Sequence, residues 1–93
     1  LLDVDHFKSI NDQHGHSAGD EVLRIIAARL GALVAPPAAF GRLGGEEFIV
    51  ALPDADLAAG LALGERLREA VLALDASRWF PDGRRITASV VVA

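Results

Sequence analysis

Apolar residues recur at intervals of three and four positions in two long stretches of the chain, a period that is typical of helices with one buried face. The first helix is predicted over about Ser17–Val34, from Val22, Leu23, Ile26, Ala27, Leu30, Leu33 and Val34. Two consecutive prolines end it. The second helix is predicted to run to about Leu74, from Leu57, Leu61, Leu67, Val71 and Leu74. Asp54 or Asp56 is placed to cap the second helix.

Short apolar runs predict the strands. Residues 1–5 form the end of a buried strand, and a short helical turn is expected over Phe7–Gln13. Phe40–Leu43 and Phe48–Leu52 predict a β-hairpin with an acidic tip, and Arg85–Val92, rich in β-branched residues, predicts a closing strand. The order β-α-α-β-β-α-β predicts an α+β fold, with helices packed on one side of a mainly antiparallel sheet.

Composition narrows the class of protein. With 93 residues, the chain is expected to be a single domain over residues 1–93, cut at both ends because it starts and stops inside predicted strands. A net charge of −4 and a single lysine, Lys8, argue against nucleic-acid binding. No apolar run is long enough for a membrane span. The absence of cysteine fits a reducing compartment, so we expect a cytoplasmic domain, whether or not the parent protein carries a membrane anchor.

Acidic residues gather at two predicted strand ends. Asp3 and Asp5 end the first strand, and Glu46 and Glu47 lie at the hairpin tip. Neighbouring strands can bring these ends together, and Mg²⁺ needs only a few carboxylates when water and phosphate complete its shell. The two glycines before Glu46 let a backbone approach a ligand closely. Taken alone, each acidic pair is more often solvated surface charge than a metal site.

Polar residues follow the first strand. Lys8 and the amides around Phe7 lie at a helix start, where positive charge favours phosphate, although an exposed lysine is the commoner case. The next loop carries a polar cluster made of Asn11, Asp12, His14, His16 and Asp20. Such side chains either bind a purine edge or form local caps, and composition leaves both interpretations open.

Several of these segments, in this order, closely resemble the GGDEF family of diguanylate cyclases. They are Asp3–Asp12 (DVDHFKSIND), Gly15–His16, Gly19–Asp20 and Arg42–Phe48 (RLGGEEF), and the resemblance covers nearly the whole chain. It implies a ferredoxin-like, palm-type nucleotidyl cyclase fold. It also implies a bacterial signalling enzyme that condenses two GTP molecules into cyclic di-GMP and releases pyrophosphate, with two subunits of a homodimer each holding one GTP.

The resemblance also implies roles for single residues. Asp3, the Val4 carbonyl and Glu46 bind Mg²⁺, or Mn²⁺ in its place. Glu47 lies near the ribose hydroxyl and helps to activate it, so that Asp3, Glu46 and Glu47 form the catalytic set. The implied substrate-binding residues are Asn11 and Asp20 at the guanine edge, Leu23 in the base pocket, Phe7 and Lys8 at the phosphates, and Gly44 and Gly45 in the turn that leaves room for them. Arg42 contacts either a nucleotide, a partner subunit or the sheet edge.

The chain departs from the family pattern at two places. The inhibitory product site, an Arg-x-x-Asp motif, is replaced by Ala35–Ala38, so we expect no product inhibition through it. Val91 stands where a Ser-x-Gly pattern has its glycine. The family's distal phosphate-binding lysine and arginine fall beyond residue 93. Two other functions stay open: a catalytically inactive module that senses GTP or cyclic di-GMP, and a dimerisation domain that binds no nucleotide.

Overall fold

The computed structural model describes all residues, 1–93, and contains four strands and three helices. The elements, in chain order, are β1 (Leu2–Val4), α1 (Phe7–His14), α2 (His16–Leu33), β2 (Ala39–Gly44), β3 (Glu47–Ala51), α3 (Leu57–Leu72) and β4 (Ala88–Val90). This is the predicted order, and it confirms the predicted α+β class.

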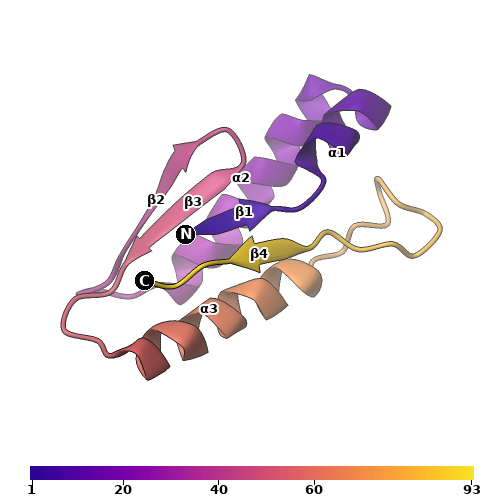
Figure 1. Ribbon diagram of the computed structural model, residues 1–93. Helices are drawn as coiled ribbons and strands as arrows, with labels where there is room; N and C mark the ends of the chain where they lie inside the picture. The colour runs from indigo at the N-terminus through magenta and orange to yellow at the C-terminus, as the bar shows by residue number, and fades with distance from the viewer.

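The four strands form one antiparallel sheet in the order β2-β3-β1-β4 (Figure 1). The first strand along the chain is therefore central, with β3 on one side and β4 on the other. In the register, Asp3 lies opposite Glu47 of β3 and opposite Ser89 of β4. Reading the order from the other edge gives 4-1-3-2, with each pair of neighbours antiparallel, as in ferredoxin-like β-α-β-β-α-β folds.

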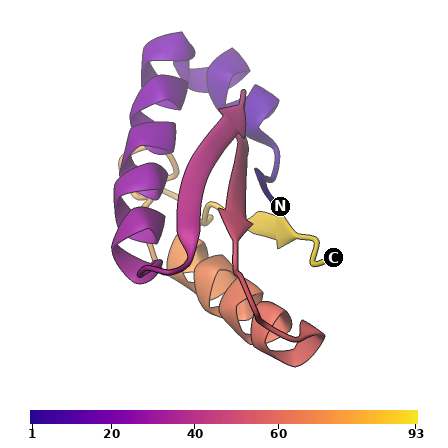
Figure 2. The same cartoon turned by 90° about the vertical axis from the view of Figure 1, so that its left-hand side faces the viewer.

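Helices α2 and α3 cover one face of the sheet and leave the other uncovered, as two perpendicular views agree (Figure 2). The core lies between these layers. Leu2 and Val4 of β1 point into it, as do Phe48 of β3 and Ile26 of α2, and each is at most 3% exposed. Asp3 and Glu47, which alternate with these residues, lie on the uncovered face. The fold thus buries alternate positions of its two central strands and leaves their carboxylates accessible.

The start of α3 and its packing on the sheet depend on an aspartate cap and two glycines. Of the two predicted caps for α3, Asp56 is the one used: its Oδ1 accepts a hydrogen bond from the Ala59 amide at 2.8 Å. Gly60 and Gly64, one turn apart on this helix, face Val92 and Val90 so closely that a Cβ would come within 2.9 and 3.0 Å of them. Small residues therefore set the distance between α3 and the sheet.

Three element predictions need correction. The hairpin turn is shorter than expected, because Gly44 still belongs to β2 and Glu47 already to β3, with a register shift between Arg42 and Gly44. The closing strand spans only Ala88–Val90. Leu57 and Leu61 are 61% and 54% exposed, not buried, and Leu57 borders an apolar groove between α3 and the C-terminal residues. The buried stripe of α2 is confirmed, with Val22, Leu23, Ile26 and Leu30 in the core.

Candidate functional site

Two of the predicted acidic residues lie opposite each other on neighbouring strands of the sheet, and the third lies in the adjoining turn. Asp3 of β1 and Glu47 of β3 are direct cross-strand partners, and Glu46 precedes Glu47 in the turn. All three side chains are half-buried. Residues directly opposite one another on antiparallel strands have their Cβ atoms about 5 Å apart. The register therefore places Asp3 beside Glu47, with Glu46 next in sequence at the hairpin tip.

The backbone of Val4 faces Glu46, next to the Asp3–Glu47 pair. Its amide donates to the Glu46 carbonyl at 3.1 Å, but Glu46 does not return the bond to the Val4 carbonyl, as paired residues of an antiparallel ladder usually do. The next amide, Asp5 N–H, donates to the Thr87 carbonyl on the β4 side at 2.9 Å. In a trans peptide the carbonyl points away from that amide. The Val4 carbonyl is thus directed to the Glu46 side and receives nothing from Glu46.

The turn between β2 and β3 depends on its two glycines. Gly44 and Gly45 both have positive φ, 152° and 51°, which L-residues with a side chain rarely adopt. A Cβ at either position would meet nothing within 4 Å, so conformation and not space requires glycine here. Arg42 Nε donates to the Gly45 carbonyl at 3.0 Å. Arg42, on the edge strand β2, thus contacts the turn of its own hairpin, and the nucleotide and partner-subunit contacts stay predictions.

This group of oxygen atoms suits a hard cation. The structure contains no preformed cluster of three or more His, Cys, Asp or Glu side chains of the kind that encloses a metal by itself. Mg²⁺ does not require one, because it is usually held by one or two carboxylates together with water and substrate phosphates. Asp3, Glu46 and the Val4 carbonyl offer oxygen donors of that kind. The donor set therefore fits a magnesium ion that is shared with a phosphorylated ligand.

Asp5, which the sequence grouped with these carboxylates, has a different role. Its Oδ2 accepts from the Thr87 hydroxyl at 2.9 Å and its Oδ1 from the Ser89 hydroxyl at 2.6 Å. Both carboxylate oxygens are thereby engaged by the β4 side of the sheet. Asp5 fastens the end of β1 to β4, at the point where His6 turns the chain with a φ of 57° before α1 begins. Sequence reasoning missed this contact because its partners lie more than 80 residues away.

The predicted base-binding residues come together where α1 meets α2. Asn11 of α1 lies against Gly19 of α2, next to Asp20. Asn11 Oδ1 is buried and has no hydrogen-bond partner. Asp20 is exposed and forms no ion pair. Leu23, the predicted wall of the base pocket, is a core residue with 4% exposure, so that role stays a prediction.

Phe7 and Lys8, at the start of α1, behave differently. Phe7 is buried under α2, and only its backbone is available to a ligand, whereas the Lys8 side chain is exposed and unpaired. Both follow directly on β1, so they lie within a few residues of Asp3 and Val4. The phosphate contacts predicted for them are compatible with these positions and stay predictions.

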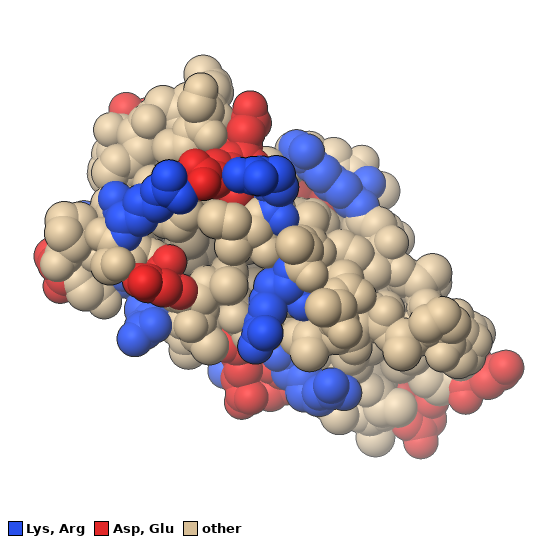
Figure 3. Space-filling view, turned by 180° about the vertical axis from the view of Figure 1, so that it is seen from behind, with Lys and Arg blue, Asp and Glu red and all other residues tan.

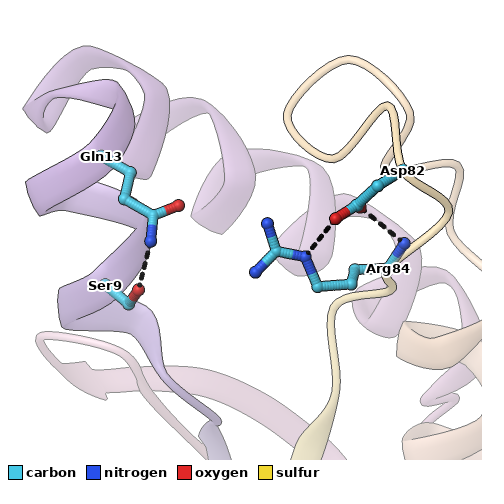
Figure 4. A network of polar contacts seen from close by, with 4 residues as sticks. All are labelled: Ser9, Gln13, Asp82 and Arg84. Atoms are coloured by element: carbon cyan, nitrogen blue, oxygen red, sulfur yellow. Dashed lines mark hydrogen bonds and ion pairs between the residues drawn. The ribbon is translucent and has the colours of Figure 1, made fainter.

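The connection from α3 to β4 folds back over α1 and α2. Arg78 binds Glu21 of α2 at 2.6 Å, and the Phe80 ring meets the His14 ring edge-on at 5.8 Å. Seen from the helix side, basic and acidic groups are interspersed (Figure 3). The connection carries Arg84, which faces the Ser9–Gln13 side of α1 across a polar cavity of about 270 Å³ (Figure 4). Asp5 lines the same cavity.

Charge in this connection perturbs one carboxylate. Asp82 accepts from the Arg84 amide at 3.1 Å and from its Nε at 2.9 Å (Figure 4). These interactions hold the pKa of Asp82 below its ordinary value, with the amide hydrogen bond as the largest cause. The Arg84 charge is therefore compensated locally, within two residues of its own position.

A second hollow lies away from the carboxylates. It is an apolar groove of about 230 Å³ between the start of α3 and the sheet, with Leu57, Leu63, Leu67 and Val90 among its lining residues.

None of the helices combines the length and the apolar character needed to cross a membrane.

Comparison with known families and relatives agrees with this geometry. Residues 1–92 match the model of the diguanylate cyclase GGDEF domain. The diguanylate cyclase DgcP of Pseudomonas aeruginosa is 53% identical over 73 residues, which is 78% of this chain and 11% of that protein. The response regulator PleD of Caulobacter vibrioides is 52% identical over 68 residues, or 73% of this chain and 15% of that protein. The chain thus spans a small part of these relatives.

Solved structures share the fold. The GGDEF domain of DgcB from Caulobacter crescentus, in complex with c-di-GMP, superposes with a TM-score of 0.83 at 37% identity, over 95% of this chain and 53% of that one. The active GGEEF domain of a diguanylate cyclase from Vibrio cholerae gives 0.79 at 34% identity, over 94% and 54%. The predicted ferredoxin-like, palm-type cyclase fold is confirmed, and the chain belongs to the GGDEF family of diguanylate cyclase domains.

Proposed function

We propose that this protein is an active, magnesium-dependent diguanylate cyclase that condenses two GTP molecules into cyclic di-GMP. The observation that carries the proposal is the meeting of Asp3, the Val4 carbonyl, Glu46 and Glu47 at the centre of the sheet, beside an intact Gly-Gly turn. An inactive sensor of GTP or cyclic di-GMP would not need this complete set. Membership of the GGDEF family supports the same reaction class.

In the proposed reaction, the 3′-hydroxyl oxygen of one GTP attacks the α-phosphorus of a second GTP. A new phosphorus–oxygen bond forms, the bond to the oxygen that bridges to the β-phosphate breaks, and pyrophosphate leaves. The reciprocal attack closes the ring. Because each chain offers one set of carboxylates, the two nucleotides are held by two chains facing each other, so the active form is a homodimer. The catalytic power comes mainly from positioning and electrostatics.

Each residue of the set has a proposed part. Asp3, Glu46 and the Val4 carbonyl hold the metal, which supplies positive charge to the triphosphate when it is bound. Glu47, on the uncovered face opposite Asp3, accepts the proton of the attacking hydroxyl. The amides at the start of α1 and the Lys8 ammonium contact the phosphates, and the glycine turn lets them approach the backbone.

Guanine recognition is assigned to Asn11 and Asp20. The buried Asn11 Oδ1 lacks a donor, and leaving such an atom unpaired is costly, so a ligand that supplies a donor is favoured. The Asp20 carboxylate is exposed and accepts hydrogen bonds only. Guanine presents N1–H and N2–H donors together, whereas adenine has no donor at N1. The two acceptors therefore favour GTP over ATP.

The experiment is synthesis of cyclic di-GMP by the full-length protein with GTP and Mg²⁺, followed by chromatography. Glu46→Gln removes one carboxylate charge from the metal site and is expected to abolish product. Glu69→Gln, an exposed carboxylate on α3, is the matched control and is expected to retain full activity. If the unaltered protein makes no product yet binds GTP or cyclic di-GMP, the sensor function replaces the enzyme.

A further inference from the structure

Gly19 occupies an unusual place for a glycine. It is the fourth residue of α2, is buried, and its amide bonds to the Gly15 carbonyl at 3.2 Å as part of the helical ladder. Its φ is not positive, so the backbone itself does not require glycine. Glycine destabilises a helix interior relative to alanine. Something other than helix formation therefore accounts for glycine at this position.

Two side chains of α1 fill the space where a Cβ would be. A Cβ on Gly19 would lie 1.8 Å from Asn11 Oδ1, 2.9 Å from Asn11 Cγ and 3.0 Å from Phe7 Cζ. Phe7 and Asn11 are four residues apart and share one face of α1. The separation of 1.8 Å is far inside van der Waals distance. Any side chain at position 19 therefore displaces the Asn11 carboxamide.

The displaced group is the one whose oxygen is buried without a partner. Asn11 Oδ1 is the only such side-chain atom in the structure. It lies against the bare backbone of Gly19, directly before Asp20, so the absence of a side chain at position 19 sets where the carboxamide stands relative to the Asp20 carboxylate.

We propose that Gly19 is a positioning residue for guanine recognition: by lacking a Cβ, it holds the Asn11 carboxamide at the place where it meets the base. This inference rests on the function proposed above. Gly19 itself does not touch the nucleotide and acts only through Asn11. Its replacement therefore lowers affinity for guanine nucleotides and leaves contacts to the triphosphate unchanged.

The test is a double-mutant cycle on the full-length protein with Gly19→Ala, Asn11→Ala and the double variant. Isothermal titration measures the binding of α,β-methylene analogues of GTP and ATP, which resist the reaction. Gly19→Ala and Asn11→Ala are each expected to weaken the GTP analogue about five- to tenfold, the effect of one lost hydrogen bond. The double variant is expected to bind like Asn11→Ala alone, and affinity for the ATP analogue is expected to stay the same throughout.

Gly31→Ala is the matched control. Gly31 lies in the same helix, and a Cβ there would make ordinary contact with the Phe40 ring, 3.7 Å away. This variant is expected to leave binding of both analogues unchanged. Thermal unfolding of the four proteins of the cycle gives an independent readout. In the parent protein, Gly19→Ala should lower the melting temperature. In the Asn11→Ala background, where the carboxamide oxygen is gone, the same substitution should lower the melting temperature less, or raise it.

The outcomes separate the inference from the function on which it rests. If the unaltered protein does not bind the GTP analogue, the proposed function is wrong. If it binds, but Gly19→Ala leaves affinity unchanged or weakens both analogues equally, the positioning role is wrong and the function stands. If Gly19→Ala weakens binding as much in the Asn11→Ala background as in the parent, Gly19 acts on the fold and not through Asn11, which also overturns the inference.

Discussion

The Asp5 carboxylate accepts a hydrogen bond from the Thr87 hydroxyl at 2.9 Å, and the backbone amide of Asp5 donates to the Thr87 carbonyl at the same distance. Side chain and backbone thus join the same two residues, 82 positions apart. Hydrogen bonds to a charged acceptor each contribute about 1.5–3 kcal/mol. We expect Asp5→Ala to lower the free energy of unfolding by about that amount, measured by urea denaturation.

A double-mutant cycle isolates the contact. Thr87→Val removes the hydroxyl and keeps the shape, and the second hydroxyl donor, Ser89, keeps part of the interaction in that variant. The interaction energy between Asp5 and Thr87 is expected to reach about 1 kcal/mol. Strictly additive effects would mean that the hydroxyl contributes nothing to the attachment of β4.

Replacing Glu47 should separate catalysis from binding. Glu47→Gln keeps the size of the side chain but cannot accept the proton of the attacking hydroxyl. We expect kcat for cyclic di-GMP synthesis to fall about 10²- to 10⁴-fold, while the affinity for a non-reacting GTP analogue stays near that of the unaltered protein. A loss of affinity comparable to the loss of rate would instead place Glu47 among the substrate-binding residues.

The glycine turn gives a prediction about stability. Gly45 has a φ of 51°, and placing an L-residue there costs about 1–2 kcal/mol. Gly45→Ala is therefore expected to lower the free energy of unfolding by that amount. Gly41→Ala, in the same hairpin, is the control, because Gly41 has no positive φ and no neighbour within 4 Å of its Cβ position. Equal effects of the two substitutions would contradict the conformational explanation.

The segment before β2 gives a prediction about how the proposed cyclase responds to cyclic di-GMP. Ala35–Ala38 forms a turn closed by a 3.0 Å bond from the Ala38 amide to the Ala35 carbonyl, and neither end is charged. We expect initial rates that do not fall when cyclic di-GMP is added. The double substitution Ala35→Arg and Ala38→Asp restores both charged ends and is expected to introduce inhibition. Inhibition of the unaltered protein would reveal a product site elsewhere.

The connection before β4 predicts a pH dependence. The pKa of Asp82 is lowered from 3.8 by the Arg84 amide and guanidinium, so the charged carboxylate stabilises the folded state. A lowered folded-state pKa gives stability that is present above pH 3.8 and is lost as the pH falls through the folded value. Asp82→Asn should therefore melt below the unaltered protein at pH 7, and the difference should shrink as the pH falls below 3.8. A constant difference would exclude this origin.

Local pattern was sufficient to predict most of the fold. The three- and four-residue spacing in α2 places Val22, Ile26 and Leu30 on one face, and each is at most 1% exposed. The same spacing in α3 was misleading for Leu57 and Leu61, because periodicity gives the apolar face of a helix but not which of its residues are covered by the rest of the chain. In the segment predicted as the closing strand, only Ala88–Val90 is a strand, although Val91 still exchanges backbone hydrogen bonds with Leu1.

The part of the candidate site that could be predicted from sequence is the part in which motif residues lie on paired strands. Asp3 and Glu47 are cross-strand partners, as expected for the ends of neighbouring strands in one sheet, and the metal-binding and catalytic roles of Asp3, Glu46 and Glu47 stay predictions. Asp5 could not be assigned, since its spacing from Asp3 suggests a shared metal and only the structure brings Thr87 and Ser89 to it. The need for glycine at position 19 was equally hidden, because it arises from the approach of two helices and not from the local sequence.

The central position of β1 has a consequence for thermal inactivation. Its end is held on one side by the Val4–Glu46 bond and on the other by the Asp5–Thr87 bond. Amides of a strand that is bonded along both edges are expected to exchange with solvent more slowly than those of an edge strand. We therefore expect Asp3, next to Val4, to lose its position only when the sheet itself opens, so that heating would remove activity and tertiary structure over the same temperature range.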